Sequence, residues 1–418
     1  MNLTPTTQIT LNPQNNKNTK MNKEETPLTT DKKLYTTAFL QQYSDQLIQR
    51  FINLLAIATG ATVDQLGFLN ATRILSINLF QLLFGRLADQ HGKKPLIITG
   101  RALNALALLA ILTVKAPTMV INLVILASIA TSMAIPSWNS LLGDYTTDTK
   151  RGQIISQINS IAYLGGLTAM ITAFLISIRD TTATTRHSYT PVILLAAAAS
   201  LLGAITALML NEKPQSNTRE PLNLKEITQD APLKRFLTLT FLYTLGSSIA
   251  MPLFPYIIAQ KLHLTVWQVA VTSITNTLVG SLSQRIIGPI MDKTGRRQVL
   301  TLSRMVMASS CLIYPFATHW THIALVEAIS GLGIASWLSS QSTYIIDIAP
   351  VRLRATYLAS SMAAIGIATF IGSNLGGQIV QNVLGGELAA VQTGLIAAGI
   401  LRLILGLAYM TVPETRPR

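Results

Sequence analysis

One stretch of the sequence decides the fold because it occurs twice: residues 85–94 read GRLADQHGKK, and residues 288–297 read GPIMDKTGRR. Each copy carries a glycine, then an aspartate, then a second glycine followed by two basic residues, all at the same spacing. The copies are 203 residues apart in a chain of 418 residues. This separation indicates that the chain consists of two similar halves.

The similarity continues on both sides of the repeated stretch. Residues 61–101 and 264–304 align without a gap and share 11 identities in 41 positions. The same offset also pairs Asp144 with Asp347, and Arg151 with Arg354. Chance matches between apolar segments would not keep one register through several helices and loops. The sequence therefore predicts an internal duplication with parallel topology, a plan that transporters use.

The composition indicates that lipid is the main solvent of this chain. Hydrophobic residues make up 49% of it and charged residues only 12%, and the mean hydropathy is +0.42. Soluble domains usually have about 25% charged residues. The net charge of +14 does not indicate a nucleic-acid partner, because the basic residues lie in short loops between apolar runs rather than on one face of a soluble domain.

Twelve segments have the length and composition of membrane-spanning helices. They lie at residues 37–59, 64–87, 95–114, 117–141, 153–177, 189–210, 235–259, 265–290, 297–316, 320–344, 355–380 and 388–411. The predicted fold class is an all-α integral membrane protein, with twelve transmembrane helices in two pseudo-symmetric six-helix bundles. The predicted divisions are a disordered tail (1–33), the first bundle (34–210), a charged linker (211–234), the second bundle (235–412) and a short tail (413–418).

Basic residues in the loops predict the orientation, because Lys and Arg resist translocation across a membrane. Most of them fall on the side that holds the two tails and the even-numbered connections. The connections on the other side hold four, namely Lys115, Arg179, Arg186 and Lys261. We therefore expect a multi-pass protein of the plasma membrane with both termini in the cytoplasm.

The repeated stretch resembles the signature loop of the major facilitator superfamily, which lies between helices 2 and 3 and is echoed between helices 8 and 9. The resemblance covers nearly the whole chain after residue 37, although Gln90 stands where an arginine is common. It implies the twelve-helix fold of that family and a transporter that works by rocking two halves around a central site. We expect a monomer that contacts its substrate and the lipid bilayer.

The resemblance also implies a latch on the cytoplasmic side. In family members the aspartate of the loop docks against the start of helix 11 and holds that side shut in the outward-open state. The expected latch residues of this chain are Gly85, Asp89, Gly92, Lys93, Lys94, Asp144 and Arg151, with Asp292, Gly295, Arg296, Arg297, Asp347 and Arg354 as their partners. The first glycine of the loop would allow close helix packing, and the second would allow a tight turn with positive φ.

Ionisable residues inside spanning helices are costly and usually functional. Polar residues also follow helical spacing along helix 1, which lines the central cavity in the resembled family. The candidates for substrate or proton binding are Asp45, Gln49, Arg50, Asn53, Arg73, Arg285 and Glu327. Two readings stay open for Glu327, a proton carrier or a solvated residue near the outer face. Arg285 either contacts the substrate or extends toward the cytoplasm.

These features predict a secondary active transporter of a small organic solute. The arginines favour an organic anion, export of amphipathic compounds is an equal alternative, and proton coupling is left open. A transporter-like receptor that binds a ligand without carrying it is the competing class. We expect no enzyme, cofactor or metal site, because the sequence has no nucleotide-binding loop, a single cysteine (Cys311) and no dense histidine cluster.

The latch hypothesis predicts the behaviour of one variant. Asp89→Asn is expected to slow transport by about tenfold and to leave membrane insertion intact, because an amide cannot form the charge-assisted contacts of a carboxylate. Transport in proteoliposomes, normalised to folded protein, measures this effect, and Gln90→Asn in the same loop is the control. Unchanged rates for Asp89→Asn would contradict the latch.

Overall fold

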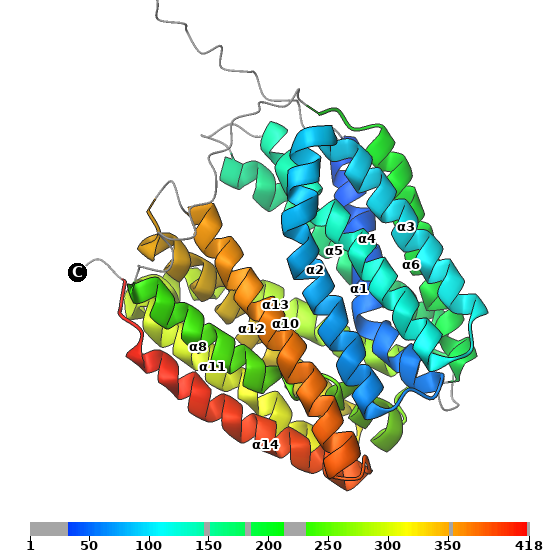
Figure 1. The fold of residues 1–418 in the computed structure, drawn as a ribbon, viewed down its shortest axis with the longest axis vertical. Coiled ribbons are helices and arrows are strands. Elements are labelled where there is room, and N and C mark those ends of the chain that lie inside the picture. Colours follow the sequence, from blue (N-terminus) through cyan, green and yellow to red (C-terminus); the bar gives the residue numbers. More distant parts are fainter. Residues whose placement is uncertain (1–31, 146–150, 180–184, 213–230, 351–353, 416–418) are drawn as a thin grey trace, which may run out of the picture.

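The computed structural model describes residues 32–145, 151–179, 185–212, 231–350 and 354–415. Within these ranges the chain forms twelve long helices, as the apolar segments predicted (Figure 1). They are α1 (Lys32–Ala58), α2 (Val63–His91), α3 (Lys93–Thr113), α4 (Pro117–Asp144), α5 (Arg151–Ser177), α6 (Thr190–Leu208), α8 (Ala231–Ser248), α10 (Val266–Thr294), α11 (Arg296–Ile313), α12 (Trp320–Ile348), α13 (Arg354–Gln378) and α14 (Leu388–Leu407).

The seventh of these helices is continued by two shorter pieces. After α8 ends at Ser248, the chain forms α9 (Leu253–Tyr256) and then a π-helical turn, Ile257–Lys261. Pro252 stands directly before α9 and cannot donate a backbone hydrogen bond, so one continuous helix is not expected here.

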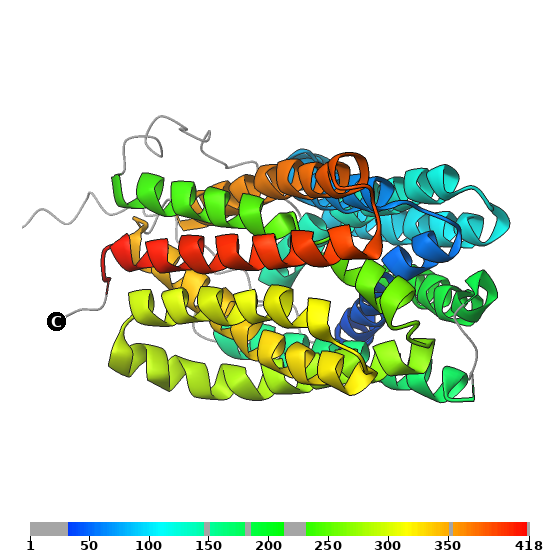
Figure 2. The same cartoon turned by 90° about the horizontal axis from the view of Figure 1, so that it is seen from below.

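The helices form two groups of six that repeat the same packing. In the first group, α3 packs against α4 and α6, and α1 packs against α5 and α6. In the second group, α11 packs against α12 and α14, and α8 packs against α13 and α14. Figure 2 shows the helices of both groups running roughly along one direction. The main contacts between the groups are α2 with α13 and α5 with α10, so the interface is also pseudo-symmetric.

The duplication extends to the local structure of the helix ends. Thr62 before α2 and Thr265 before α10 each form a capping box with a glutamine three residues later. Gly92 and Gly295 have φ angles of 102° and 106°, in the region that favours glycine. The predicted positive φ at these two turns is thus confirmed, and it allows α2 and α10 to reverse directly into the next helix.

Most of the helices are apolar enough to contact lipid. In the described part of the chain, ten pass a test of length and hydropathy for a membrane span. The two long helices that fail are α1 and α10, which carry polar residues along their length. Large apolar side chains are exposed on several of the others, among them Leu106, Leu126, Leu175, Leu302, Leu325 and Ile404. An exposed apolar surface of this kind fits a hydrocarbon solvent.

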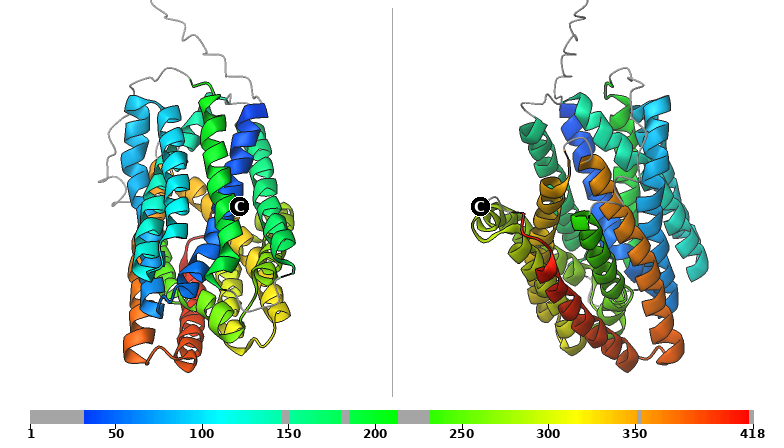
Figure 3. Two further views of the ribbon diagram at one scale, coloured as in Figure 1. Left: turned by 90° about the vertical axis from the view of Figure 1, so that its right-hand side faces the viewer. Right: turned by 60° about the vertical axis from the view of Figure 1, so that its left-hand side comes forward.

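The two groups touch at one end and diverge at the other. We call the end with Gly92 and Gly295 the basic end, and the end where α2 and α10 begin the opposite end. Among the described residues, the hydrogen bonds between the groups lie in the half of the molecule toward the opposite end, for example from Ser373 Oγ to the carbonyl oxygen of Gly67 at 3.1 Å. Figure 1 and the right-hand view of Figure 3 show the helices inclining apart toward the basic end.

Glycines bring α2 and α13 into backbone contact at the opposite end. A Cβ atom on Gly67 would lie 2.6 Å from the carbonyl oxygen of Ser373, and one on Gly377 would lie 2.8 Å from that of Val63. Both distances are too short for a side chain. The two groups therefore meet here without side chains between their backbones, a contact that small residues allow in membranes.

Candidate functional site

The repeated loops hold an ion pair of the same kind in each half. Lys93 Nζ lies 2.6 Å from Asp144 Oδ1 and joins the start of α3 to the end of α4. At the equivalent place in the second half, Arg296 Nε lies 3.2 Å from Asp347 Oδ2. Arg296 also contacts Asp292 at 3.0 Å. Each of these described ion pairs therefore joins elements of the same half.

Two glutamates complete these clusters, and the sequence analysis missed them. Glu212 Oε2 accepts hydrogen bonds from the backbone N–H groups of Lys93 and Lys94, at 2.8 and 2.9 Å. Glu414 accepts the corresponding pair from Arg296 and Arg297, at 2.9 and 3.2 Å. A carboxylate at a helix N-terminus satisfies free donors and opposes the helix dipole.

The sequence contains a pattern that could have identified Glu212 and Glu414. Each glutamate follows the last helix of its half by a few residues, and the two positions nearly keep the offset of the duplication. The glutamates therefore connect the end of each half to the start of its third helix.

Parts of the predicted latch are not described. The side chains of Asp89, Arg151 and Arg354 lie outside the described residues, so docking of Asp89 on the other half stays a prediction. The expectation for Gly85 is wrong in this conformation, because a Cβ there would meet Pro136 at an ordinary 3.7 Å. No close packing requires glycine at that position while the basic ends stand apart.

Asp45 on α1 forms a bidentate ion pair with a residue that was not predicted as a site. Arg101 on α3 donates to both carboxylate oxygens of Asp45, at 2.6 and 3.0 Å. The Arg101 side chain is 3% exposed, and that of Asp45 is 32% exposed. The paired, planar geometry is the strong form of the interaction. Arg101 is one of the residues conserved between the two copies, which was a usable signal.

Arg73 on α2 stands next to this pair without joining it. Its charge interacts with Asp45, but it donates no hydrogen bond to any residue that the structure describes. Its side chain is half-buried. Because Asp45 already accepts two hydrogen bonds from Arg101, the group of three residues keeps one excess positive charge.

The other two polar candidates on helix 1, Gln49 and Asn53, differ in exposure and in hydrogen bonding. Gln49 is exposed. Asn53 donates to Asn70 Oδ1 on α2 at 3.2 Å, and Asn70 in turn donates to the carbonyl oxygen of Leu66. Asn53 therefore ties α1 to α2, whereas Gln49 has no such partner among the described residues.

Arg50 and Glu327 come together across the two halves. Arg50 Nη1 on α1 lies 3.3 Å from Glu327 Oε2 on α12. Tyr314 donates its hydroxyl to the other oxygen of Glu327 at 2.8 Å. The Glu327 side chain is 15% exposed, so it is not the freely solvated residue that one of the two readings described. In the described residues this is the single ion pair that links the halves.

Arg304 is the counterpart of Arg101 in the second half, but its surroundings differ. Its guanidinium lies over three aromatic rings, 4.3 Å from the centre of Tyr243, 4.7 Å from Trp337 and 5.1 Å from Tyr409. It also donates to Gln341 Oε1 at 3.2 Å. Arg304 is 2% exposed and has no described carboxylate partner. Aromatic faces therefore take the place that Asp45 occupies in the first half.

Two further arginines lie within helices of the second half. Arg402 on α14 donates to the backbone carbonyl oxygens of Met307 and Ser247, at 3.0 and 3.3 Å. These bonds give it a structural role inside the bundle. Arg285 on α10 is exposed, and no hydrogen bond links it to a described residue.

Comparison with known proteins gives the same family in sequence and in structure. The profile described as Major Facilitator Superfamily matches residues 34–237 and again residues 236–418. An uncharacterized MFS-type transporter of Methanocaldococcus jannaschii is 20% identical over 378 residues, which are 86% of this chain and 92% of that protein. The multidrug resistance protein MdtH of Proteus mirabilis is 25% identical over 337 residues, 75% of this chain and 79% of that protein.

Solved structures of other transporters have the same fold. The nucleoside transporter NupG superposes with a TM-score of 0.73 at 14% identity, covering 91% of this chain and 98% of that one. A bacterial homolog of the lysosomal transporter Spinster, in an inward-facing and unoccupied conformation, superposes with a TM-score of 0.68 at 14% identity. That alignment covers 91% of this chain and 94% of the homolog. At these identities the likeness shows the fold.

The ion pair between α1 and α3 leads to a stability prediction. Asp45→Asn leaves the Arg101 guanidinium buried without a counter-charge, which should lower the free energy of unfolding by about 2–3 kcal/mol. This loss is smaller than the usual cost of breaking a fully buried ion pair, because Asp45 is partly exposed. Thermal denaturation of the purified protein measures the loss, with Gln49→Ala as the control.

A second variant separates the ion pair from side-chain size. Adding Arg101→Gln to Asp45→Asn should restore part of the stability, because no buried charge is then left alone. A double variant less stable than Asp45→Asn would contradict this account.

Proposed function

The chain belongs to the major facilitator superfamily of transporters, and from this membership we propose that it carries a small organic anion between its two halves. The observation that carries the proposal is the excess positive charge at Arg73. The other arginines that the structure describes in the long helices have carboxylate, aromatic or backbone carbonyl partners, or lie toward the basic end. Arg73 is half-buried and lies beside the Asp45–Arg101 ion pair, and it donates no hydrogen bond to any described residue.

Arginine suits a carboxylate or phosphate because its planar donors match two oxygens at once. A guanidinium that donates no hydrogen bond is costly at membrane depth unless something else pairs with it. An anionic substrate supplies that partner, and the adjacent Asp45–Arg101 pair fixes the position of neighbouring donors. Arg304 in the other half is already surrounded by three aromatic rings and Gln341, so Arg73 alone carries the choice of an anion.

The arrangement of the halves supports alternating access. With the orientation proposed from the basic loops, the basic end faces the cytoplasm, and this conformation is closed on the other side. The Gly67–Gly377 contact and the Arg50–Glu327 pair belong to the closed side. In the alternate state we propose that these contacts open and that the clusters around Asp89 and Asp292 close the cytoplasmic side.

Glu327 is the carboxyl that we propose to couple transport to protons. It meets Arg50 from α1 and Tyr314 from the chain after α11, and its backbone oxygen accepts from Asn276 on α10. Opening the closed side removes Arg50 from Glu327, because the two residues belong to different halves. A carboxylate that loses its counter-charge in a low-dielectric site gains affinity for a proton. The proton and the conformation are thereby linked at one residue.

The anion hypothesis predicts a loss of binding at Arg73. Arg73→Ala should weaken binding of the accepted anion by about 10- to 100-fold, because hydrogen bonds to charged groups contribute about 1.5–3 kcal/mol each. Ligand-dependent thermal stabilisation across a panel of carboxylates, phosphates and cationic drugs identifies the anion and measures its affinity. Lys115→Ala, which removes a cation from a loop, is the matched control.

The outcome also decides the substrate class. Stabilisation by cationic or neutral compounds alone, unchanged in Arg73→Ala, would reject the anion hypothesis. Folded protein must be verified in each case, since loss of folding would point to a structural role for Arg73.

The coupling hypothesis predicts a change in driving force rather than in binding. Glu327→Gln should keep exchange of substrate across the membrane but lose accumulation driven by a proton gradient, because an amide cannot take up the proton. Counterflow and gradient-driven uptake in the same proteoliposomes measure the two properties. Glu387→Gln removes another acid at the same end and serves as the control. Gradient-driven accumulation by Glu327→Gln at the wild-type level would reject the hypothesis.

A further inference from the structure

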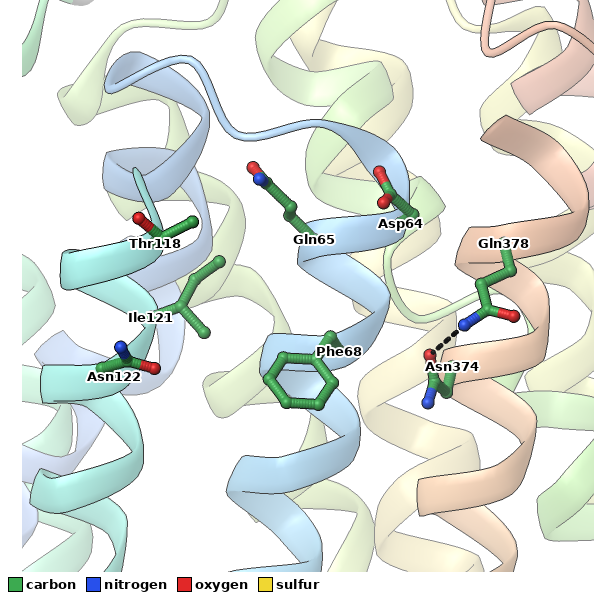
Figure 4. Close-up of a pocket in the computed structure, with 8 residues that line it drawn as sticks. All are labelled: Asp64, Gln65, Phe68, Thr118, Ile121, Asn122, Asn374 and Gln378. Carbon is green, nitrogen blue, oxygen red and sulfur yellow. Dashed lines mark hydrogen bonds between the residues drawn. The ribbon is translucent and has the colours of Figure 1, made fainter. Parts of the chain in front are cut away.

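A cavity lined by both polar and apolar side chains lies at the opposite end, away from the central charges. It has a volume of about 400 Å3 and is formed by the first turns of α2 and α4 and the last turns of α13 (Figure 4). The polar residues that line it are Asp64, Gln65, Thr118, Asn122, Asn374 and Gln378. Phe68 and Ile121 supply the apolar part of the wall.

This cavity is separate from the path proposed for the anion. Phe68 in its wall and Arg73 are five residues apart on α2, which places them about 140° apart around the helix axis. Phe68 is 42% exposed, so its ring is on the outer surface of the bundle. An occupant of the cavity would therefore not meet the charges around Asp45.

The lining groups form a site for a positive charge. Asp64 is the charged residue of the wall, and it forms no ion pair with any Lys or Arg that the structure describes. Its Oδ1 accepts from Thr62 Oγ1, which leaves Oδ2 available. An exposed aromatic ring four residues further on adds an attractive surface for a cation.

One amide group of the wall adds an acceptor beside Asp64, which suits an ammonium that carries N–H donors. Gln378 donates its Nε2 to Asn374 Oδ1 at 3.2 Å, as Figure 4 shows, so the Gln378 carbonyl oxygen remains as an acceptor. Gln378 lies on the same side of α2 as Asp64, because a Cβ on the neighbouring Gly377 would lie 3.0 Å from the Asp64 Cα, whereas Asn122 lies on the other side of α2. A primary ammonium has three N–H donors and can donate to the Asp64 carboxylate and to the Gln378 carbonyl oxygen together, with one donor left for water.

The cavity exists because the two halves are in contact. Asp64 and Asn122 belong to the first half, whereas Asn374 and Gln378 belong to the second. The backbone contact at Gly377 lies directly beside Gln378. When the halves separate at this end, the wall from α13 moves away from the wall from α2. An occupant therefore binds this conformation better than the alternate one and must favour it.

We propose that the cavity binds a primary ammonium group and that its occupant holds the opposite end closed, which slows the transport cycle. The site is an effector site and takes no part in carrying the anion. The ammonium can come from a small soluble amine or from the headgroup of an ethanolamine lipid, because the cavity opens on the surface of the bundle near a membrane face.

A distance measurement at the basic end tests the proposal without any substrate. Spin labels at Gln90→Cys and Thr294→Cys, in a Cys311→Ser background, report the separation of the two halves. Ethanolamine should raise the population with widely separated labels, and ethylene glycol, of similar size but without the charge, should not. Vesicles of phosphatidylethanolamine should act in the same way relative to phosphatidylcholine, whose quaternary ammonium has no N–H donor.

Variants assign the effect to the cavity. Asp64→Asn should raise the concentration of ethanolamine needed for half the effect by about two- to fivefold, the scale of a partly exposed charge interaction. Glu387→Gln, which removes an acid at the same end outside the cavity, should not change it. An effect of only the lipid or only the soluble amine supports the site and identifies the source of its ammonium.

Two results would overturn the proposal: no shift with either source of ammonium, or an equal shift in Asp64→Asn. Arg73→Ala should respond like the wild type, since Arg73 is outside the cavity. The failure of this proposal is therefore distinguishable from failure of the proposed anion site.

Discussion

An ionised side chain inside a membrane needs a partner within the protein, because lipid offers none. The arginines in the helices meet this requirement in different ways. Arg101 has a carboxylate on α1, Arg304 has three aromatic faces, and Arg402 has backbone carbonyls. Arg50 has a carboxylate in the other half, so its partner is present in only one arrangement of the halves. Arg73 has a neighbouring charge but no described hydrogen bond, and this difference gives the substrate proposal its starting point.

The duplicated residues and the unduplicated ones serve different purposes. The turns at Gly92 and Gly295, the ion pairs at the basic end and the glutamates that cap the third helix of each half are present in both copies. These features hold each half together as a unit that can move without internal change. At the centre the copies differ: Arg101 faces an acid and its counterpart Arg304 faces aromatic rings. Because the residues at the centre differ between the copies, the two similar halves would enclose one asymmetric substrate site.

The sequence was sufficient for the helices, the duplication and the positive φ of the two loop glycines, because hydrophobic runs and repeated spacing are local properties of the chain. It also pointed to Asp45 and Arg73, since any charge in an apolar run is unusual. It did not reveal that Asp45 pairs with Arg101, because the pairing depends on how α1 and α3 are rotated against each other. The role of Glu212 was missed for the same reason, as its partners are backbone donors more than 100 residues earlier. Whether Gly85 packs closely depends on which conformation is adopted, and a sequence does not specify one.

The backbone contact between Gly67 and Gly377 also has a mechanical meaning. It lies near one end of α2, and the part of α2 from there to His91 is about 36 Å long at 1.5 Å per residue. As long as the opposite end stays closed, a tilt about this contact would have a short arm on one side and a long arm on the other. By simple lever geometry on a helix of that length, a tilt of about 10° at the glycines displaces the far end by about 6 Å. A larger side chain at Gly67 or Gly377 would therefore displace most strongly the loops that lie farthest from this contact.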